Sequence, residues 1–191
     1  FSYKTEPFEH QVESFDYAKD HPCFLLGDEQ GLGKTKQAID IAVSRKHEFR
    51  HCLIVCCVSG LKWNWAKEVE IHSNEQAHII GSRVNRKGNL TIDGVQKRVE
   101  DLLLDHKEYF LITNIETLRD KSFTSALKEL TNAGEIGMVV VDEIHKCKNP
   151  TSQQGEALHS LNSFYKIGLT GTPLLNSPVD TYNILKWLGV E

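Results

Sequence analysis

Apolar runs alternate with longer amphipathic stretches along this chain, and this pattern limits the possible folds more than any other feature. The runs cover residues 23–27, 52–58, 77–80, 109–113, 138–142 and 164–170. They are apolar at successive positions, as is typical of strands that lie between two layers of helices. The stretches between them predict helices at 34–44, 61–71, 95–105, 123–131, 152–161 and 179–188. The chain is therefore predicted to be a three-layer α/β domain, with a mostly parallel sheet and helices on both faces.

Size and composition narrow the class of protein. A chain of 191 residues with 40% hydrophobic and 25% charged content can form one globular domain. We expect no membrane association, because there is no apolar run of membrane-spanning length and no leader-like start. The five cysteines lack CxxC spacing and the nine histidines lack HExxH spacing. The sequence therefore predicts no zinc site, and it predicts buried, inert thiols at Cys56 and Cys57.

The segment GDEQGLGKT, residues 27–35, lies between a predicted strand and a predicted helix. Gly31 and Gly33 permit backbone angles that point successive N–H groups at phosphate oxygens. Lys34 would reach the β- and γ-phosphates, and the Thr35 hydroxyl would bind magnesium. A glycine-rich turn that happens to carry a lysine is the alternative. The candidate nucleotide-binding residues here are Asp28, Glu29, Gln30, Gly31, Leu32, Gly33, Lys34 and Thr35.

Two adjacent carboxylates, Asp142 and Glu143, follow the apolar run of residues 138–141. The carboxyl ends of parallel strands open on one edge of the sheet, so Asp142 and Lys34 are expected to meet there. Asp142 would hold magnesium, and Glu143 would polarise the water that attacks the γ-phosphorus. An acidic pair on the surface is the alternative.

The segment GLTGTP, residues 168–173, follows another predicted strand. Thr170 and Thr172 could hydrogen-bond the carboxylates or His145, and so couple the state of the nucleotide to movement. A turn that ends at proline explains the composition almost as well.

Taken in order, these segments resemble the motifs of Swi/Snf-type ATPases within the DEAD/DEAH superfamily-two helicases. The resemblance is carried by residues 27–35, 53–70, 111–120, 142–152 and 169–177. It implies that the chain is the first RecA-like, ATP-binding lobe (residues 1–191) of a longer two-lobe protein. It also implies the cofactors ATP and Mg²⁺, and duplex DNA as the partner of the full-length protein.

The resemblance assigns further residues. Gln11 would read the adenine, and Ser59 would contact the nucleic-acid backbone. One face of a helix and an ordinary N-cap are the respective alternatives. No arginine follows Arg119 in the sequence. Because a catalytic arginine from the second lobe is typically worth orders of magnitude in rate, we expect the isolated lobe to be poorly active.

The strongest basic cluster is Arg83, Arg86 and Lys87, for which a solvated loop is the alternative to a nucleic-acid contact. A net charge of −4 argues against a simple nucleic-acid coat protein. Other readings are the motor of a strand-separating helicase or restriction enzyme, a nucleotide-gated binding module that has lost hydrolysis, and a P-loop kinase. We expect a monomeric lobe in a cytoplasmic protein of bacterial or phage origin, or a nuclear protein if the source is eukaryotic.

Overall fold

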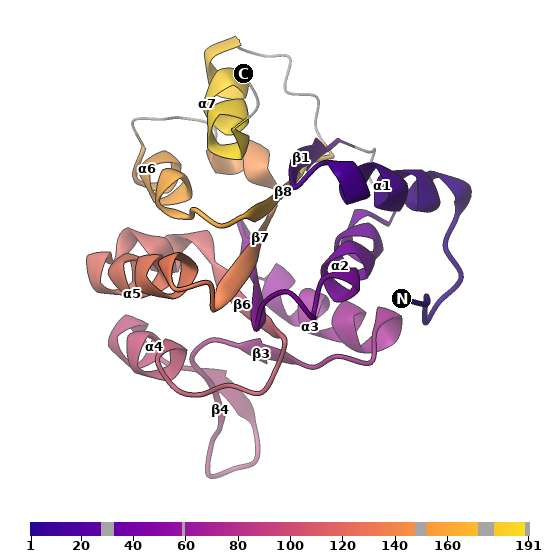
Figure 1. Ribbon diagram of the computed structural model, residues 1–191. Coiled ribbons are helices and arrows are strands. Elements are labelled where there is room, and N and C mark those ends of the chain that lie inside the picture. Colours follow the sequence, from indigo (N-terminus) through magenta and orange to yellow (C-terminus); the bar gives the residue numbers. More distant parts are fainter. Residues whose placement is uncertain (28–32, 59, 148–151, 172–177, 190–191) are drawn as a thin grey trace.

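The computed structural model describes residues 1–27, 33–58, 60–147, 152–171 and 178–189. Within them, a parallel sheet of six strands has the order β1-β8-β7-β2-β6-β3 (Figure 1). The strands are β1 (Cys23–Leu26), β2 (His51–Cys56), β3 (Ala77–Ile79), β6 (Phe110–Asn114), β7 (Ile136–Asp142) and β8 (Tyr165–Leu169). Every neighbouring pair is parallel. The predicted parallel sheet is confirmed, because each of its strands falls on one of the six apolar runs.

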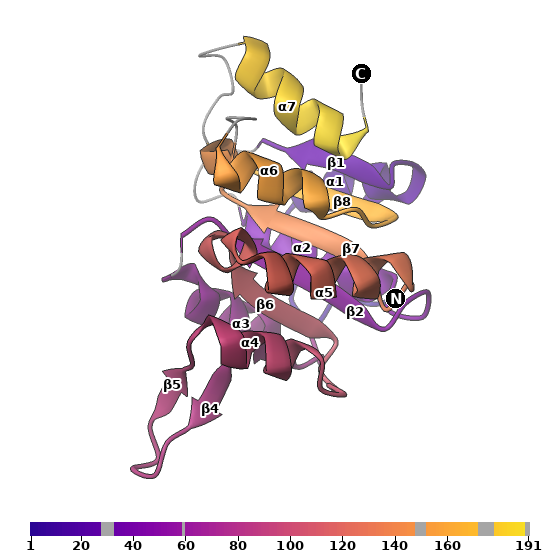
Figure 2. The ribbon, with the colours of Figure 1, turned by 90° about the vertical axis from the view of Figure 1, so that its left-hand side faces the viewer.

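Helices cover both faces of the sheet, so the three-layer prediction is confirmed as well (Figures 1 and 2). One face carries α1 (Glu9–Asp20), α2 (Lys34–Ser44) and α3 (Leu61–His72). The other carries α4 (Val95–Leu102), α5 (Lys121–Asn132), α6 (Gln153–Ser160) and α7 (Pro178–Leu188), with the short 3-10 helices η1 (Ile115–Arg119) and η2 (Ile144–Cys147). None of the helices in this described part of the chain has the length and apolar character needed to cross a membrane.

The central strands are buried on both faces, as their continuous apolar sequence requires. In β2, Leu53 and Val55 belong to the core beneath α5, whereas Cys52, Ile54 and Cys56 belong to the core beneath α2. All five are 0% exposed. Burial of an aliphatic side chain of this size stabilises the fold by about 1.5–3 kcal/mol, so this strand anchors both cores.

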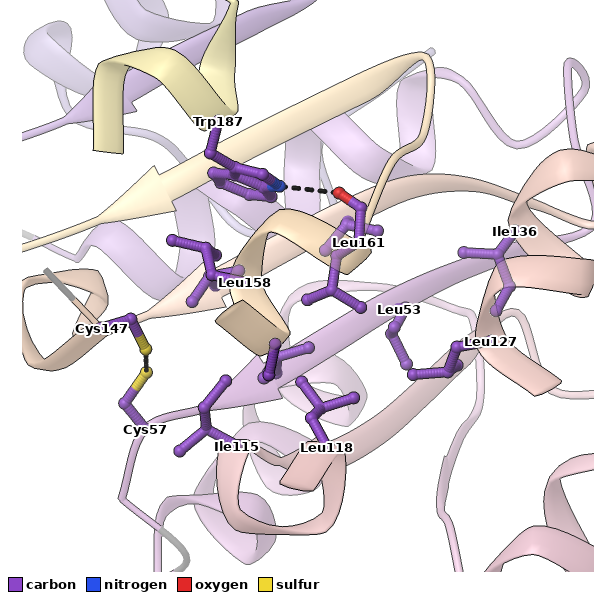
Figure 3. Close-up of a cluster of buried hydrophobic side chains, with 14 of the residues drawn as sticks. Leu53, Cys57, Ile115, Leu118, Leu127, Ile136, Cys147, Leu158, Leu161 and Trp187 are labelled. Atoms are coloured by element: carbon purple, nitrogen blue, oxygen red, sulfur yellow. Dashed lines mark hydrogen bonds between the residues drawn. The ribbon is translucent and has the colours of Figure 1, made fainter. Parts of the chain in front are cut away.

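The core beneath α5, α6 and α7 extends to the carboxyl end of the sheet (Figure 3). Trp187 of α7 is 3% exposed, and its Nε1–H donates to the carbonyl of Leu161 at 2.7 Å. At the other end of this core, the Sγ atoms of Cys57 and Cys147 lie 3.0 Å apart. The hydrogen bond with Cys147 and burial raise the pKa of the Cys57 thiol. The predicted burial of Cys56 and Cys57 is confirmed, with exposures of 0% and 6%.

The exposed turn that carries Arg86 and Lys87 is the tip of a β-hairpin, whose two strands were not predicted from the sequence. Its antiparallel strands are β4 (Ser82–Val84) and β5 (Leu90–Ile92). The side chain of Asn85 accepts from the backbone N–H groups of Lys87 and Asn89, at 2.9 Å each, and thereby closes the turn. Each strand has only three residues and mixes polar with apolar side chains, so neither produces an apolar run that the sequence pattern could reveal.

The amino-terminal region also differs from the sequence expectation. Helix α1 was not among the predicted helices, although one face of a helix was the alternative interpretation of Gln11. Its mean hydropathy is low and it buries only Gln11 and Ala18 fully, so the apolar periodicity is weak. Helix α4 ends at Leu102 rather than at the predicted residue 105.

Candidate active site

The carboxyl ends of β1, β7 and β8 form the sheet edge at which the sequence motifs meet. Thr170, directly after β8, donates its backbone N–H to the carbonyl of Leu26 at 3.0 Å. Cys57, directly after β2, donates to the carbonyl of Asp142 at 3.2 Å. These bonds continue the strand pairing past the strand ends and so fix where the following loops begin. Ligands of parallel α/β sheets bind at this edge.

Gly33 forms the start of α2 with a backbone that glycine favours. Its φ is 71° and its ψ is 40°, in the left-handed region. A Cβ atom at this position would lie 2.5 Å from Nε2 of Gln11. The left-handed conformation therefore favours glycine at this position, and a larger residue would also displace the Gln11 amide. Gly33 leads directly into Lys34 and Thr35 at the helix N-terminus. The other predicted loop residues, Asp28, Glu29, Gln30, Gly31 and Leu32, lie outside the described residues.

Gln11 lies beside this loop start although it belongs to a different helix. It is the third residue of α1, is 4% exposed, and its Oε1 accepts from the backbone N–H of Phe8 at 2.9 Å. The structure thus makes Gln11 part of the helix cap and also brings its amide to Gly33. The adenine contact stays a prediction, supported by this proximity to the phosphate loop.

Asp142 ends β7, and its carboxylate is held by α3. The indole Nε1–H of Trp65 donates to Asp142 Oδ2 at 2.8 Å. Burial raises the pKa of Asp142, while the hydrogen bond from Trp65 and the positive charge of Lys34 act in the opposite direction. Lys34 is therefore close enough to act on this carboxylate, as the shared sheet edge predicted.

Trp65 itself has two roles. It is 1% exposed and packs in the core beneath α2. The sequence reasoning missed its second role, which is to orient Asp142 through a bond between residues 77 positions apart. No local pattern encodes such a contact, although an indole that is buried requires a hydrogen-bond acceptor.

Glu143 has an unusual backbone. Among the described non-glycine residues it alone has a positive φ, of 56°. A left-handed conformation costs a non-glycine residue roughly 1–2 kcal/mol. Such strain often gathers at functional positions, and here it coincides with the residue predicted to activate water.

A chain of polar contacts links the ends of β7 and β8. The Oε2 atom of Glu143 is 3.2 Å from Nε2 of His145, and Nδ1 of His145 is 2.9 Å from Oγ1 of Thr170. Thr170 is 2% exposed. The structure therefore brings these three predicted residues together, whereas Thr172 lies outside the described residues. Their coupling role stays a prediction.

Comparison of the chain with models of protein families identifies the family to which it belongs. The model of the SNF2-related domain matches residues 13–191. The chain belongs to the SNF2-related family. The sequence resemblance to Swi/Snf-type ATPases is thereby confirmed.

Curated relatives of this SNF2-related domain are much longer than the chain. The mouse protein named DNA repair and recombination protein RAD54-like is 30% identical over 183 residues, which cover 88% of the chain and 22% of that protein. The mouse protein named Chromodomain-helicase-DNA-binding protein 1-like is 29% identical over 167 residues, which cover 84% of the chain and 17% of that protein. The chain thus spans about a fifth of these relatives.

Solved structures share the fold of this SNF2-related domain. The SWI2/SNF2 ATPase core domain of Sulfolobus solfataricus is 26% identical, with a TM-score of 0.70, over 98% of the chain and 36% of the neighbour. The core from the same organism in complex with dsDNA is 24% identical with a TM-score of 0.75, over 98% of the chain and 36% of the neighbour. The RecA-like fold prediction is confirmed.

A second polar group at the same sheet edge was missed by the sequence reasoning. Oδ1 of Asn114, the last residue of β6, accepts from Lys62 at 3.2 Å, from Arg98 at 3.3 Å and from Thr117 at 2.8 Å. Arg98 also donates to Thr117 Oγ1 at 2.7 Å. Burial and the charge of Arg98 lower the pKa of Lys62, which is only 4% exposed. The one sequence signal was an asparagine at the end of an apolar run.

The residues predicted to contact nucleic acid are separated from the carboxylates. Arg83, Arg86 and Lys87 are exposed on the β4–β5 hairpin, which projects from the β3 side of the molecule (Figure 2). Nε of Arg83 is paired with Asp93 Oδ1 at 2.6 Å. Ser59 lies outside the described residues.

Proposed function

We propose that this SNF2-related domain is the ATP-binding lobe of a DNA-dependent ATPase that translocates along duplex DNA. The observation that carries the proposal is the meeting of three features at one sheet edge. These are the glycine-started helix α2 with Lys34, the partly buried carboxylate of Asp142, and the strained Glu143. A surface acidic pair would need neither the burial nor the strain.

The side chains at this edge fit magnesium and a nucleotide triphosphate. The hydroxyl of Thr35 and the carboxylate of Asp142 are hard oxygen ligands of the kind that magnesium prefers. The missing Cβ at Gly33 leaves the backbone N–H groups of α2 open to phosphate oxygens, and Lys34 supplies positive charge beside them. Bound magnesium would supply charge neutralisation at the phosphates.

Glu143 would orient and polarise the attacking water, because its carboxylate follows Asp142 directly and is held at His145. The His145–Thr170 contact would pass a change at Glu143 to the segment after β8. A second RecA-like lobe of the same polypeptide would close the site and supply an arginine. We therefore propose that the isolated lobe hydrolyses ATP poorly.

The exposed residues of the hairpin offer a secondary contact with DNA. Arg86 and Lys87 lie near its tip, and their charges can neutralise backbone phosphates. The double variant Arg86→Ala/Lys87→Ala should flatten the dependence of DNA affinity on salt, by about two units of logarithmic slope. An unchanged slope would remove the hairpin from the DNA-binding surface.

The deciding experiment measures ATP hydrolysis by the full-length protein with no nucleic acid, with single-stranded DNA and with duplex DNA. Wild type is compared with Glu143→Gln and with the control Glu129→Gln, which changes an exposed carboxylate on α5. We expect strong stimulation by duplex DNA in wild type and control, and its loss in Glu143→Gln. A rate of hydrolysis that does not change when DNA is added would favour a nucleotide-gated module. Strand displacement in the same samples would favour a helicase.

A further inference from the structure

A group of metal-binding side chains lies at the β3 edge of the sheet, at the opposite end of the strand order from β1 and outside the nucleotide site. His78 comes from β3, Asp101 from α4, and His106 from the segment between α4 and β6. One possible ligand atom from each lies within 4.8 Å of the other two. These positions share no ligand spacing in the sequence, so only the fold brings them together.

The three side chains are held in place by surrounding contacts. Oδ2 of Asp101 lies 2.6 Å from Nε2 of His78 and accepts from the backbone N–H of Gly81 at 2.6 Å. Nε2 of His106 lies 2.5 Å from the carbonyl oxygen of Asp101, and 3.7 Å from its Oδ1. The two imidazole rings stack with centroids 4.4 Å apart. The group is therefore preorganised rather than a chance meeting of mobile surface residues.

Partial burial gives the group the environment of a binding site. The side chains of His78 and Asp101 are 18% exposed and that of His106 is 10% exposed. Water can still reach one side, which leaves a route for an ion and a position for a water ligand. Glu108 also faces the group, with its Oε2 atom 3.8 Å from Nδ1 of His106. A carboxylate of this kind commonly orients the imidazole of a metal ligand.

The donor atoms match zinc in type and in spacing. Imidazole nitrogen and carboxylate oxygen bind zinc at about 2.0–2.2 Å, so neighbouring ligand atoms of a tetrahedral site are roughly 3.3 Å apart. Nε2 of His78 lies 2.6 Å from Oδ2 of Asp101 and Nε2 of His106 lies 3.7 Å from Oδ1, so each imidazole faces an oxygen of the same carboxylate at a separation near that value. Zinc would replace the proton now shared by His78 and Asp101, and would displace the hydrogen bond from His106 to the Asp101 carbonyl.

We propose that His78, Asp101 and His106 bind one zinc ion, through one nitrogen of each imidazole and one carboxylate oxygen, with water as the fourth ligand. The ion fastens the base of the β4–β5 hairpin. Gly81, which is bound to Asp101, immediately precedes β4, and its carbonyl accepts from the backbone N–H of Asp93 just after β5 at 2.9 Å. Zinc therefore joins β3, α4 and both ends of the hairpin.

The test is titration of the chelator-treated full-length protein with ZnCl₂ by calorimetry, together with Co²⁺ as a spectroscopic probe. The variants are His78→Gln and His106→Gln, and the matched control is His47→Gln, which changes an exposed histidine outside the group. We expect wild type and His47→Gln to bind one more equivalent of zinc than either ligand variant, or to bind it at least about tenfold more tightly.

The cobalt spectrum of wild type decides the matter even if a ligand variant fails to fold. Nitrogen and oxygen ligation in a four-coordinate site gives visible absorption bands without the intense near-ultraviolet band of thiolate ligation. Bands of that kind in wild type support the proposal, and their loss in a folded His78→Gln variant assigns them to this group. Equal zinc binding by all four proteins, a thiolate band, or no visible cobalt absorption in wild type would overturn it and leave the group as a hydrogen-bonded clamp.

Discussion

Two polar groups occupy the carboxyl end of the same sheet and are built in opposite ways. The acidic group follows β7, where Asp142 accepts from the indole of Trp65 and Glu143 lies beside the imidazole of His145. The basic group follows β6, where one amide oxygen, Oδ1 of Asn114, accepts three hydrogen bonds. Strand β2 lies between them.

The difference fits the proposed ligand-binding role of the acidic group and a structural role for the basic group. An ionised carboxylate has about four lone-pair sites, so Asp142 can accept from Trp65 and still bind a cation, whereas Oδ1 of Asn114 already accepts three hydrogen bonds. Changes in the acidic group should therefore reduce hydrolysis more than stability. Changes in the basic group should do the reverse.

The largest expected effect comes from removing Arg98. This side chain donates to the Asp93 carbonyl at 2.7 Å, to Asn114 and to Thr117. Arg98→Ala leaves several partners unsatisfied, so urea unfolding should show a loss of about 2–4 kcal/mol. The control Lys97→Ala changes an exposed neighbour on α4 and should stay within about 0.5 kcal/mol. A loss of under about 1 kcal/mol for Arg98→Ala would contradict the structural role.

For Trp65→Phe we expect a larger effect on hydrolysis than on stability. Phenylalanine keeps most of the packing but cannot donate to Asp142, so the carboxylate loses its orientation and one influence that lowers its pKa. DNA-stimulated kcat should fall about 10–100-fold, while the free energy of unfolding changes by about 1 kcal/mol. Trp63→Phe, at a residue that is 42% exposed, is the control. If stability fell and kcat did not, the comparison of the two groups would be wrong.

A smaller effect is expected for Thr170→Val, which keeps the side-chain shape and removes the hydroxyl next to His145. We expect stimulation by duplex DNA to fall about fivefold, corresponding to roughly 1 kcal/mol of coupling, with basal hydrolysis retained. Thr124→Val removes a hydroxyl that donates to the Leu118 carbonyl and has no part in the Glu143–His145–Thr170 contacts, and it serves as the control. Equal stimulation in Thr170→Val and wild type would exclude the coupling role.

The smallest effect is expected for Lys62→Met, because burial already lowers the pKa of Lys62 and so opposes its charge. The free energy of unfolding near neutral pH should change by less than about 1 kcal/mol. Between the lowered folded pKa and the ordinary value of 10.5, the unfolded chain binds the proton that the folded chain has lost. The free energy of unfolding of wild type, relative to that of Lys62→Met, should therefore increase as pH rises through that interval. A decrease would contradict the lowered pKa of Lys62.

Much of the fold was predictable because burial leaves a direct trace in the sequence. A strand covered on both faces needs a continuous apolar run, as in residues 138–141, and a phosphate loop needs glycine at Gly33 for a reason local to the backbone. The positions of Lys34 and Asp142 at one edge then followed from parallel topology.

The remaining features depend on contacts between distant residues. Two examples are the hydrogen bond from Trp65 to Asp142 and the hydrogen bonds from Lys62 and Arg98 to Asn114. They depend on side-chain directions that no periodic pattern in the sequence specifies. The hairpin was missed because its strands are short and exposed. The group of His78, Asp101 and His106 was missed because zinc spacing was sought along the chain and not across the fold.

Alkylation of the thiol pair Cys57 and Cys147 can report local opening at the candidate active site. These cysteines lie just beyond β2 and at the end of η2, on the two segments that flank Asp142, and neither is more than 6% exposed. Cys52 and Cys56 lie inside the sheet and can be alkylated only when the sheet itself comes apart. The alkylation rate of Cys57 and Cys147, relative to that of Cys52 and Cys56, therefore measures how often this end of the sheet opens locally. A ligand that keeps it closed should lower that relative rate.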